Sequence, residues 1–130
     1  MLVRMILACS AILLLTPPAA AQDCQTLGYE AREQVLRQAP SCDKAKELFG
    51  DCAYGASGDI SLGQIVTEKC EATFLQKLGA AQRRSYDHEM KRCDDQYKNK
   101  DGTMYRAMAA GCRADLAQSY AHKFGKPRAR

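Results

Sequence analysis

The sequence lacks several signals that would assign a chemistry. It contains no tryptophan and only two histidines, and no segment alternates apolar and polar residues with the period of two that predicts β-strands. No Cys-x-x-Cys pair occurs, so the dithiol motif of thioredoxin-like enzymes, the usual zinc-knuckle pair and the attachment motif for covalent haem are absent. No apolar run reaches the roughly 20 residues that cross a bilayer as a helix. These absences argue against a β fold, a redox dithiol and a permanent membrane span.

The histidines do not form a recognisable catalytic motif. His88 is followed by a glutamate, but the zinc-protease motif needs a second histidine four residues after the first, where Arg92 stands. His88 and His122 both fall among charged residues on polar helical faces, where we expect solvated side chains. The sequence therefore indicates no catalytic residue and no bound metal, and we predict that the protein is not an enzyme.

The methionines offer one alternative to a protein without a metal, which is a copper site. Met90, Met104 and Met108 have thioether sulfurs, which suit Cu(I). Met90 and Met108 fall on apolar helical stripes, however, and methionine in such positions usually fills gaps in a core. We therefore expect packing in place of a copper site, and no cofactor.

The first 21 residues have the features of a signal peptide. Arg4 provides a positive start, an apolar run of about eleven residues extends from Met5 to Leu15, and Ala19 to Ala21 form a small-residue cleavage site. A helix of that length spans roughly 16 Å, about half of a bilayer core, so a permanent anchor is disfavoured. We expect a periplasmic or secreted chain that is not transmembrane after cleavage, with a helical domain over residues 22–124 and a basic flexible tail over 125–130.

The cysteines are arranged for disulfide bonds. The chain has seven, and loss of Cys9 with the signal peptide leaves an even set, as expected in an oxidising compartment. Most of the rest fall on the apolar stripe of a predicted helix, where a thiolate is disfavoured and a link to a neighbouring helix is favoured. The remaining cysteines are Cys24, Cys42, Cys52, Cys70, Cys93 and Cys112.

Their connectivity does not follow from the sequence, because so many cysteines allow many pairings. In a hairpin that turns near Asp101, Cys93 and Cys112 lie within about one helical turn of each other. A Cys70–Cys93 pair would be about as far out of register, so this pairing remains an alternative. Each bridge between neighbouring cysteines closes a loop of about 20 residues, for which chain entropy gives about 3 kcal/mol. Our leading pairing is Cys24–Cys42, Cys52–Cys70 and Cys93–Cys112.

Helical periodicity dominates the chain after the leader. We predict five helical segments joined by short loops, with Ser41 and Asp59 as N-caps of the second and third. Short loops favour antiparallel neighbours, so the predicted fold class is all-α: a small antiparallel bundle of four to five helices, cross-linked by disulfides. The predicted core stripes are Leu27, Ala31, Val35 and Ala39; Ala45, Leu48, Phe49 and Cys52; Leu62, Ile65, Val66, Cys70, Phe74 and Leu78; Tyr86, Met90, Cys93 and Tyr97; and Tyr105, Met108, Cys112, Leu116 and Tyr120.

Charge is divided unevenly along the chain. From Gln22 to Gly79 there are 6 Lys/Arg against 9 Asp/Glu, and from Ala80 to Arg130 there are 12 against 6. A solvated helix surface is the simplest interpretation, but the pattern also fits a docking face for anionic lipid headgroups or polymer. The tyrosines near the basic residues fall on inward stripes, where they cannot easily stack on bases. We therefore expect no nucleic-acid partner.

One stretch resembles a known family. Residues 42–62 have the sequence CDKAKELFGDCAYGASGDISL, and a tyrosine follows later on a predicted helix. Together they resemble the small exported LprI-type lysozyme-inhibitor domain, over roughly Cys42 to Lys98. The resemblance implies a periplasmic, helical, cysteine-bridged module whose family includes inhibitors of lysozyme. The positions that carry it are Cys42, Ala45, Cys52, Leu62 and Tyr86.

Two functional expectations follow. The first is an exported, non-enzymatic small helical protein that acts through a surface as a lysozyme-inhibitor-like binding module, with a lysozyme as its protein partner. The alternative is an envelope-associated structural protein whose basic C-terminal half contacts anionic lipid or polymer.

Overall fold

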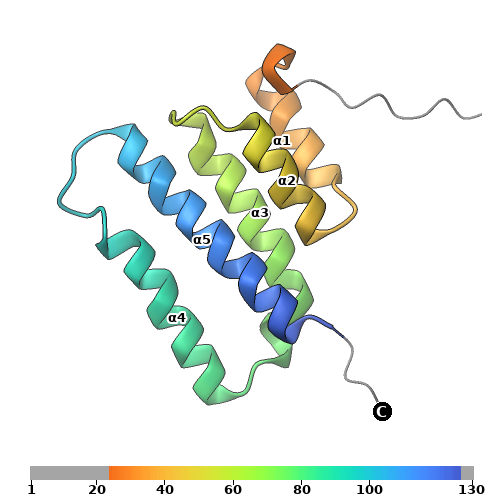
Figure 1. Ribbon diagram of the computed structural model, residues 1–130, viewed down its shortest axis with the longest axis vertical. Helices are drawn as coiled ribbons and strands as arrows, with labels where there is room; N and C mark the ends of the chain where they lie inside the picture. The colour runs from red at the N-terminus through yellow and green to blue at the C-terminus, as the bar shows by residue number, and fades with distance from the viewer. Residues whose placement is uncertain (1–23, 127–130) are drawn as a thin grey trace, which may run out of the picture.

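Five α-helices and two short 3₁₀ turns make up the part of the chain that the computed structural model describes, residues 24–126 (Figure 1). No strand occurs in that range, so the predicted all-α bundle with disulfide cross-links is confirmed. The predicted signal peptide and residues 127–130 of the predicted tail lie outside the described residues. The helices are α1 (Tyr29–Gln38), α2 (Cys42–Cys52), α3 (Gly58–Phe74), α4 (Ala80–Asp95) and α5 (Thr103–Phe124), and the 3₁₀ turns are Cys24–Thr26 and Leu75–Lys77.

Helix α3 lies at the centre of the arrangement (Figure 1). Helices α1 and α2 pack on one side of it and α5 on the other, while α4 lies beside α5 at the outer edge. Consecutive helices run antiparallel, so α3 and α5, with α4 between them in sequence, run in the same direction. The central position of α3 explains why most of its predicted stripe is buried, namely Leu62, Ile65, Val66, Cys70 and Phe74.

Small side chains form the contact between α3 and α5. A Cβ atom placed on the buried Gly63 would lie 3.0 Å from both the Cβ and the carbonyl oxygen of Ala110, so the two backbones approach as closely as glycine allows. The buried residues of α5 are all alanines: Ala107, Ala109, Ala110, Ala114, Ala117 and Ala121.

The predicted core stripe of α5 was therefore wrong in part. Met108 is 46% exposed, and the other large residues of that stripe (Tyr105, Cys112, Leu116 and Tyr120) are only half-buried. The reason is steric, because a face that packs this closely on another helix has no room for a large side chain. Cys112, Leu116 and Tyr120 instead face the space between α4 and α5.

The stripe of α1 is also displaced from the prediction. Leu36, which the prediction omitted, is fully buried together with Ala39, while Leu27, Ala31 and Val35 are half-buried. Helix α1 contacts both α2 and α3, so its most buried line points between two neighbours and does not follow a strict step of four residues.

One of the two predicted helix caps is present and the other differs. The hydroxyl of Ser41 accepts a hydrogen bond from the backbone N–H of Lys44 at 3.1 Å and caps α2 as predicted. Asp59 lies inside the first turn of α3, and its buried carboxylate accepts the backbone N–H groups of Tyr54 and Ala56 at 2.9 and 3.1 Å, together with that of Gly55. Asp59 thus holds the preceding loop, in which Gly55 has a φ of 73° that glycine adopts without strain.

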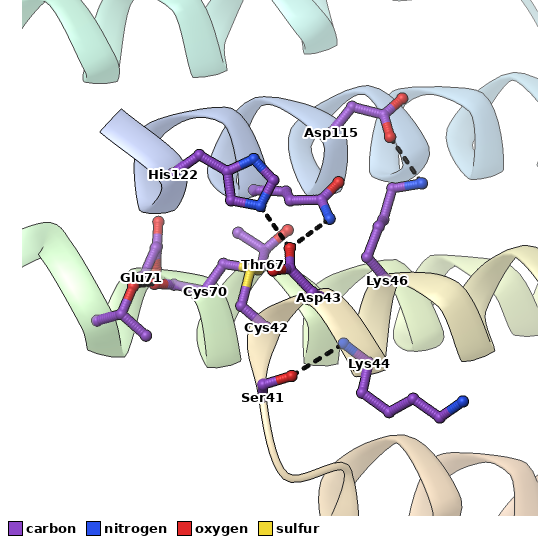
Figure 2. Close-up of a disulfide and its surroundings, with 12 residues drawn as sticks. Ser41, Cys42, Asp43, Lys44, Lys46, Thr67, Cys70, Glu71, Asp115 and His122 are labelled. Atoms are coloured by element: carbon purple, nitrogen blue, oxygen red, sulfur yellow. Dashed lines mark hydrogen bonds and ion pairs between the residues drawn. A yellow bond between two sulfur atoms is a disulfide. The ribbon is translucent and has the colours of Figure 1, made fainter. Parts of the chain in front are cut away.

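The disulfides correct two of the three expected bridges. Cys24 is joined to Cys52 and Cys42 to Cys70, with Cα–Cα distances of 5.0 and 4.6 Å, in place of Cys24–Cys42 and Cys52–Cys70. Because α2 and α3 are antiparallel, the start of α2 lies beside the later part of α3, which brings Cys42 to Cys70 (Figure 2). The end of α2 then meets the 3₁₀ turn before α1. The third bridge joins Cys93 to Cys112, as in the leading pairing.

Helix α4 is held to the bundle at few points. Its buried residues are Tyr86 and Cys93. The ring of Tyr86 packs edge-on against Phe74, with centroids 5.2 Å apart, and its hydroxyl donates a hydrogen bond to Glu71 at 2.8 Å. Burial, and then the hydrogen bond to Glu71, raise the pKa of Tyr86.

We expect Gly63→Leu to lower the free energy of unfolding by about 1–3 kcal/mol, because a side chain there must force α3 and α5 apart. Gly50→Leu is the matched control, since a Cβ at Gly50 of α2 meets nothing within 4 Å. Leucine is the better helix former, so the control should be neutral or more stable by up to about 1 kcal/mol. Urea denaturation followed by circular dichroism measures both, and equal effects would contradict the close packing.

The raised pKa of Tyr86 also gives a pH prediction. The folded state favours the neutral phenol of Tyr86. Its contribution to the free energy of unfolding is therefore complete below the unfolded-state pKa of about 10 and is lost as the pH rises above that value. The free energy of unfolding should therefore fall more steeply above pH ~10 in the wild type than in Tyr86→Phe. Tyr54→Phe, at an exposed tyrosine, should follow the wild type. Equal slopes for wild type and Tyr86→Phe would show that the Tyr86 phenol is not responsible.

Candidate binding surface

The turn end of the α4–α5 hairpin carries a pocket of about 480 Å³, called here the hairpin pocket. One wall comes from the start of α3, another from the end of α4 and the turn that follows it, and the third from the first half of α5. The lining residues are Ile60, Asp94, Tyr97, Lys98, Lys100, Tyr105, Arg106, Ala109 and Arg113.

Two tyrosines form the aromatic part of this pocket. The rings of Tyr97 and Tyr105 stack with their centroids 6.3 Å apart and their planes inclined by 28°. The ammonium group of Lys100 lies over the ring of Tyr105, 5.4 Å from its centroid. Both tyrosines are half-buried, so they are less fully inward than their stripes predicted, and both line the pocket. The turn between them depends on Gly102, whose φ of 115° favours glycine.

The pocket is electropositive. Of its four cationic side chains, Arg113 forms an ion pair with Asp94, the one carboxylate of the lining, and Lys98 approaches Asp95 at 3.8 Å. The N-terminus of α5 opens at this end of the hairpin with no acidic residue in its first turn and no side-chain cap. Its partial positive charge therefore adds to the field of the cations. An anionic group placed here meets donors on several sides.

A second hollow of about 800 Å³ lies between α4 and α5, around the Cys93–Cys112 bridge, and is called here the disulfide groove. Its charges are mixed, with two carboxylates and one guanidinium, so it does not share the sign of the hairpin pocket. Glu89, Arg92, Cys93, Asp95, Gln96, Cys112 and Leu116 line it.

The histidines lie on the surface, and one of them contacts a carboxylate. Asp43 of α2 accepts a hydrogen bond from Gln118 at 2.7 Å and pairs with the ring of His122, both on α5 (Figure 2). These two contacts, that of Gln118 first, lower the pKa of Asp43. The adjacent sulfur of Cys42 is held in a disulfide with Cys70, so it is no nucleophile. The cluster joins α2 to α5 and resembles no catalytic triad.

The methionines do not share one environment. Met90 is half-buried against the core, as expected. Met104 and Met108 are 48% and 46% exposed, so the expectation that Met108 packs in the core was wrong. Within residues 24–126 no group of three or more His, Cys, Asp or Glu side chains is placed to hold a metal ion.

The excess of basic residues in the second half of the chain is visible in the sequence, but the hairpin pocket is not. The turn predicted at Asp101 lies between the segment from Lys98 to Lys100 and Arg106. That turn was the sequence signal from which their proximity could have been inferred. The contribution of Ile60 from α3 had no sequence signal, because it depends on how α3 packs on α5.

No helix among the described residues is long and apolar enough to cross a membrane. In comparisons with known proteins, no family model, no curated protein and no solved structure matches this chain.

Proposed function

We propose that this chain is an exported, non-enzymatic binding protein and that its hairpin pocket binds phosphate-bearing headgroups of anionic envelope lipid. The observation that carries the proposal is the gathering of four cationic side chains around one pocket, with a single carboxylate among them that is already paired to Arg113. The predicted signal peptide supports export. The three disulfides are typical of proteins that fold outside the cytoplasm.

The chemistry of the pocket suits a phosphate headgroup. Guanidinium groups donate two parallel hydrogen bonds to phosphate oxygens, and ammonium groups bind phosphate as compact point charges. The rings of Tyr97 and Tyr105 offer an apolar wall for the glycerol or sugar next to the phosphate. Each Lys or Arg near an anionic lipid surface contributes about 1 kcal/mol, and salt screens this contribution over about 10 Å at 0.1 M. The resulting binding is therefore moderate and depends on salt.

We expect the double variant Lys100→Ala/Arg106→Ala to bind vesicles of phosphatidylglycerol more weakly by about 2 kcal/mol, or roughly 30-fold. The matched control is Arg84→Ala/Lys123→Ala, which removes the same charge at two exposed residues outside the pocket. Cosedimentation across a salt series measures both variants, and neutral phosphatidylcholine vesicles show the background. Equal losses in the two double variants would indicate attraction by net charge alone and would reject the pocket.

Lysozyme inhibition is the second candidate function, and the loop from Tyr54 to Ser57 favours it. Asp59 holds this loop through three backbone hydrogen bonds, so little conformational entropy is lost when it docks. The loop presents Tyr54, which is 49% exposed and lies under the guanidinium of Arg32 at 4.5 Å. Tyrosine and arginine are frequent energetic centres of protein interfaces. The loop also lies within the segment that resembles the LprI-type domain, in the acidic half of the chain, which complements a basic enzyme.

We expect the oxidised protein to slow cell-wall hydrolysis by a lysozyme, and Tyr54→Ala to weaken that inhibition by about tenfold or more, since hot-spot truncations cost about 2 kcal/mol. Met104→Ala is the control, because it truncates a side chain of similar exposure outside the loop. A turnover assay with purified protein measures the inhibition constant. An unchanged rate with the inhibitor in micromolar excess removes this candidate.

A further inference from the structure

The three disulfides differ in their access to solvent. The four cysteines of Cys24–Cys52 and Cys42–Cys70 are between 0% and 7% exposed. Cys112 is half-buried, and both it and Cys93 line the disulfide groove. We propose that the Cys93–Cys112 bridge is a site of thiol–disulfide exchange that takes a dithiol reductant in this groove, while the other two bridges stay closed to it.

The groove suits an incoming thiolate. Its volume of about 800 Å³ admits a small dithiol or a short peptide segment. Both of its carboxylates are already engaged, because Glu89 accepts a hydrogen bond from Tyr120 at 2.7 Å and Asp95 pairs with Lys91 at 2.6 Å.

The guanidinium of Arg92 is the one cationic group that lines the groove. Its side chain makes no ion pair or hydrogen bond within the described residues. Arg92 therefore supplies an uncommitted positive charge for the attacking sulfur, and a nearby cation raises the thiolate fraction of a thiol.

The exchange is a balanced two-electron step. One thiolate of the dithiol attacks Sγ of Cys112, the more exposed partner, and forms a mixed disulfide, while the Cys93–Cys112 bond breaks and Cys93 leaves as a thiolate. The second thiol then attacks the mixed disulfide, which frees Cys112 and leaves the reductant oxidised to its own disulfide. The two protons released by the dithiol are taken up by Cys93 and Cys112, so the protein is reduced to a dithiol without a further co-reactant.

The bridge fastens the end of α4 that carries part of the hairpin pocket. Further from the turn, in the middle of α4, the hydroxyl of Tyr86 donates a hydrogen bond to Glu71, and Glu89 accepts one from Tyr120. Near the turn, the connections to α5 are the bridge itself, the ion pair of Asp94 with Arg113 and the stacked tyrosines of the pocket. Reduction therefore loosens the pocket wall from Asp94 to Lys100, while α5 remains packed on α3. Redox control of ligand binding follows, and this last step rests on the proposed anion-binding function.

Partial reduction of the native protein tests the site. The oxidised protein is treated with limiting dithiothreitol, quenched with iodoacetamide at intervals and mapped by mass spectrometry. We expect alkylation of Cys93 and Cys112 roughly tenfold faster than of the other cysteines, because exchange follows access and thiolate character. Equal or faster labelling of either other pair overturns the proposal.

A variant of Arg92 separates the accessibility of the Cys93–Cys112 bridge from the electrostatic attraction of the attacking thiolate. Arg92→Gln should slow exchange with dithiothreitol severalfold while leaving reduction by a neutral phosphine unchanged, because only the thiolate carries a charge. Arg84→Gln, at an exposed position outside the groove, should leave both rates unchanged. If Arg92→Gln leaves the dithiothreitol rate unchanged, or slows both reductants alike, the role of Arg92 as a guide is overturned.

Hydrogen exchange of the selectively reduced protein tests the consequence. Amides from residues 90–100 should exchange faster than in the oxidised form, while those of α3 stay unchanged, and equal exchange overturns the release of α4.

Vesicle binding then separates the two proposals. Oxidised protein that binds and reduced protein that binds less supports redox control, whereas equal binding overturns it. If the oxidised protein does not bind either, the proposed function fails and the selective exchange stands by its own labelling result.

Discussion

The close approach of α3 and α5 is the constraint on which the rest of this structure depends. Gly63 and Ala110 bring the two backbones together at a distance that admits no larger side chain. The other buried residues of α5 are alanines as well, and α3 and α5 share the most extensive helix contact among the described residues. Because this face is occupied by small residues, the large side chains of α5 are displaced to its flanks, and they become the surface on which α4 packs. The position of α4 is thus a consequence of the α3–α5 contact.

Helix α4 attaches to α5 and to the last part of α3 through a few strong contacts and not through a broad apolar seam. The buried ring and hydroxyl of Tyr86 hold its middle, and the bridge from Cys93 to Cys112 holds the end near the turn. Such an arrangement leaves hollows beside α5, which are the disulfide groove and the hairpin pocket. The features from which we infer binding and exchange therefore have one structural origin.

The two halves of the chain differ in charge and also in how their disulfides are buried. The acidic half forms α1 to α3, where two buried disulfides and the Asp59 carboxylate fix the helices and a loop. The basic half forms the α4–α5 hairpin, where the only bridge is the accessible one. An electropositive pocket next to the more accessible bridge fits a ligand site that responds to redox conditions. The fixed Tyr54 loop in the other half fits a docking element for a protein.

The sequence by itself determined the helical class, the separation into five helices and the presence of bridges, because periodicity, caps such as Ser41 and an even set of cysteines are local or countable signals. It did not determine which cysteines pair, since Cys42 meets Cys70 only after α2 folds back on α3. Nor did it identify the buried face of α5, because alanine has little hydrophobic signal of its own and its burial depends on the glycine that faces it. The hairpin pocket likewise needed Ile60 from a helix distant in sequence. Local properties such as periodicity and helix caps can be read from the sequence. Contacts between helices depend on the shapes of the packed surfaces, which only the tertiary structure decides.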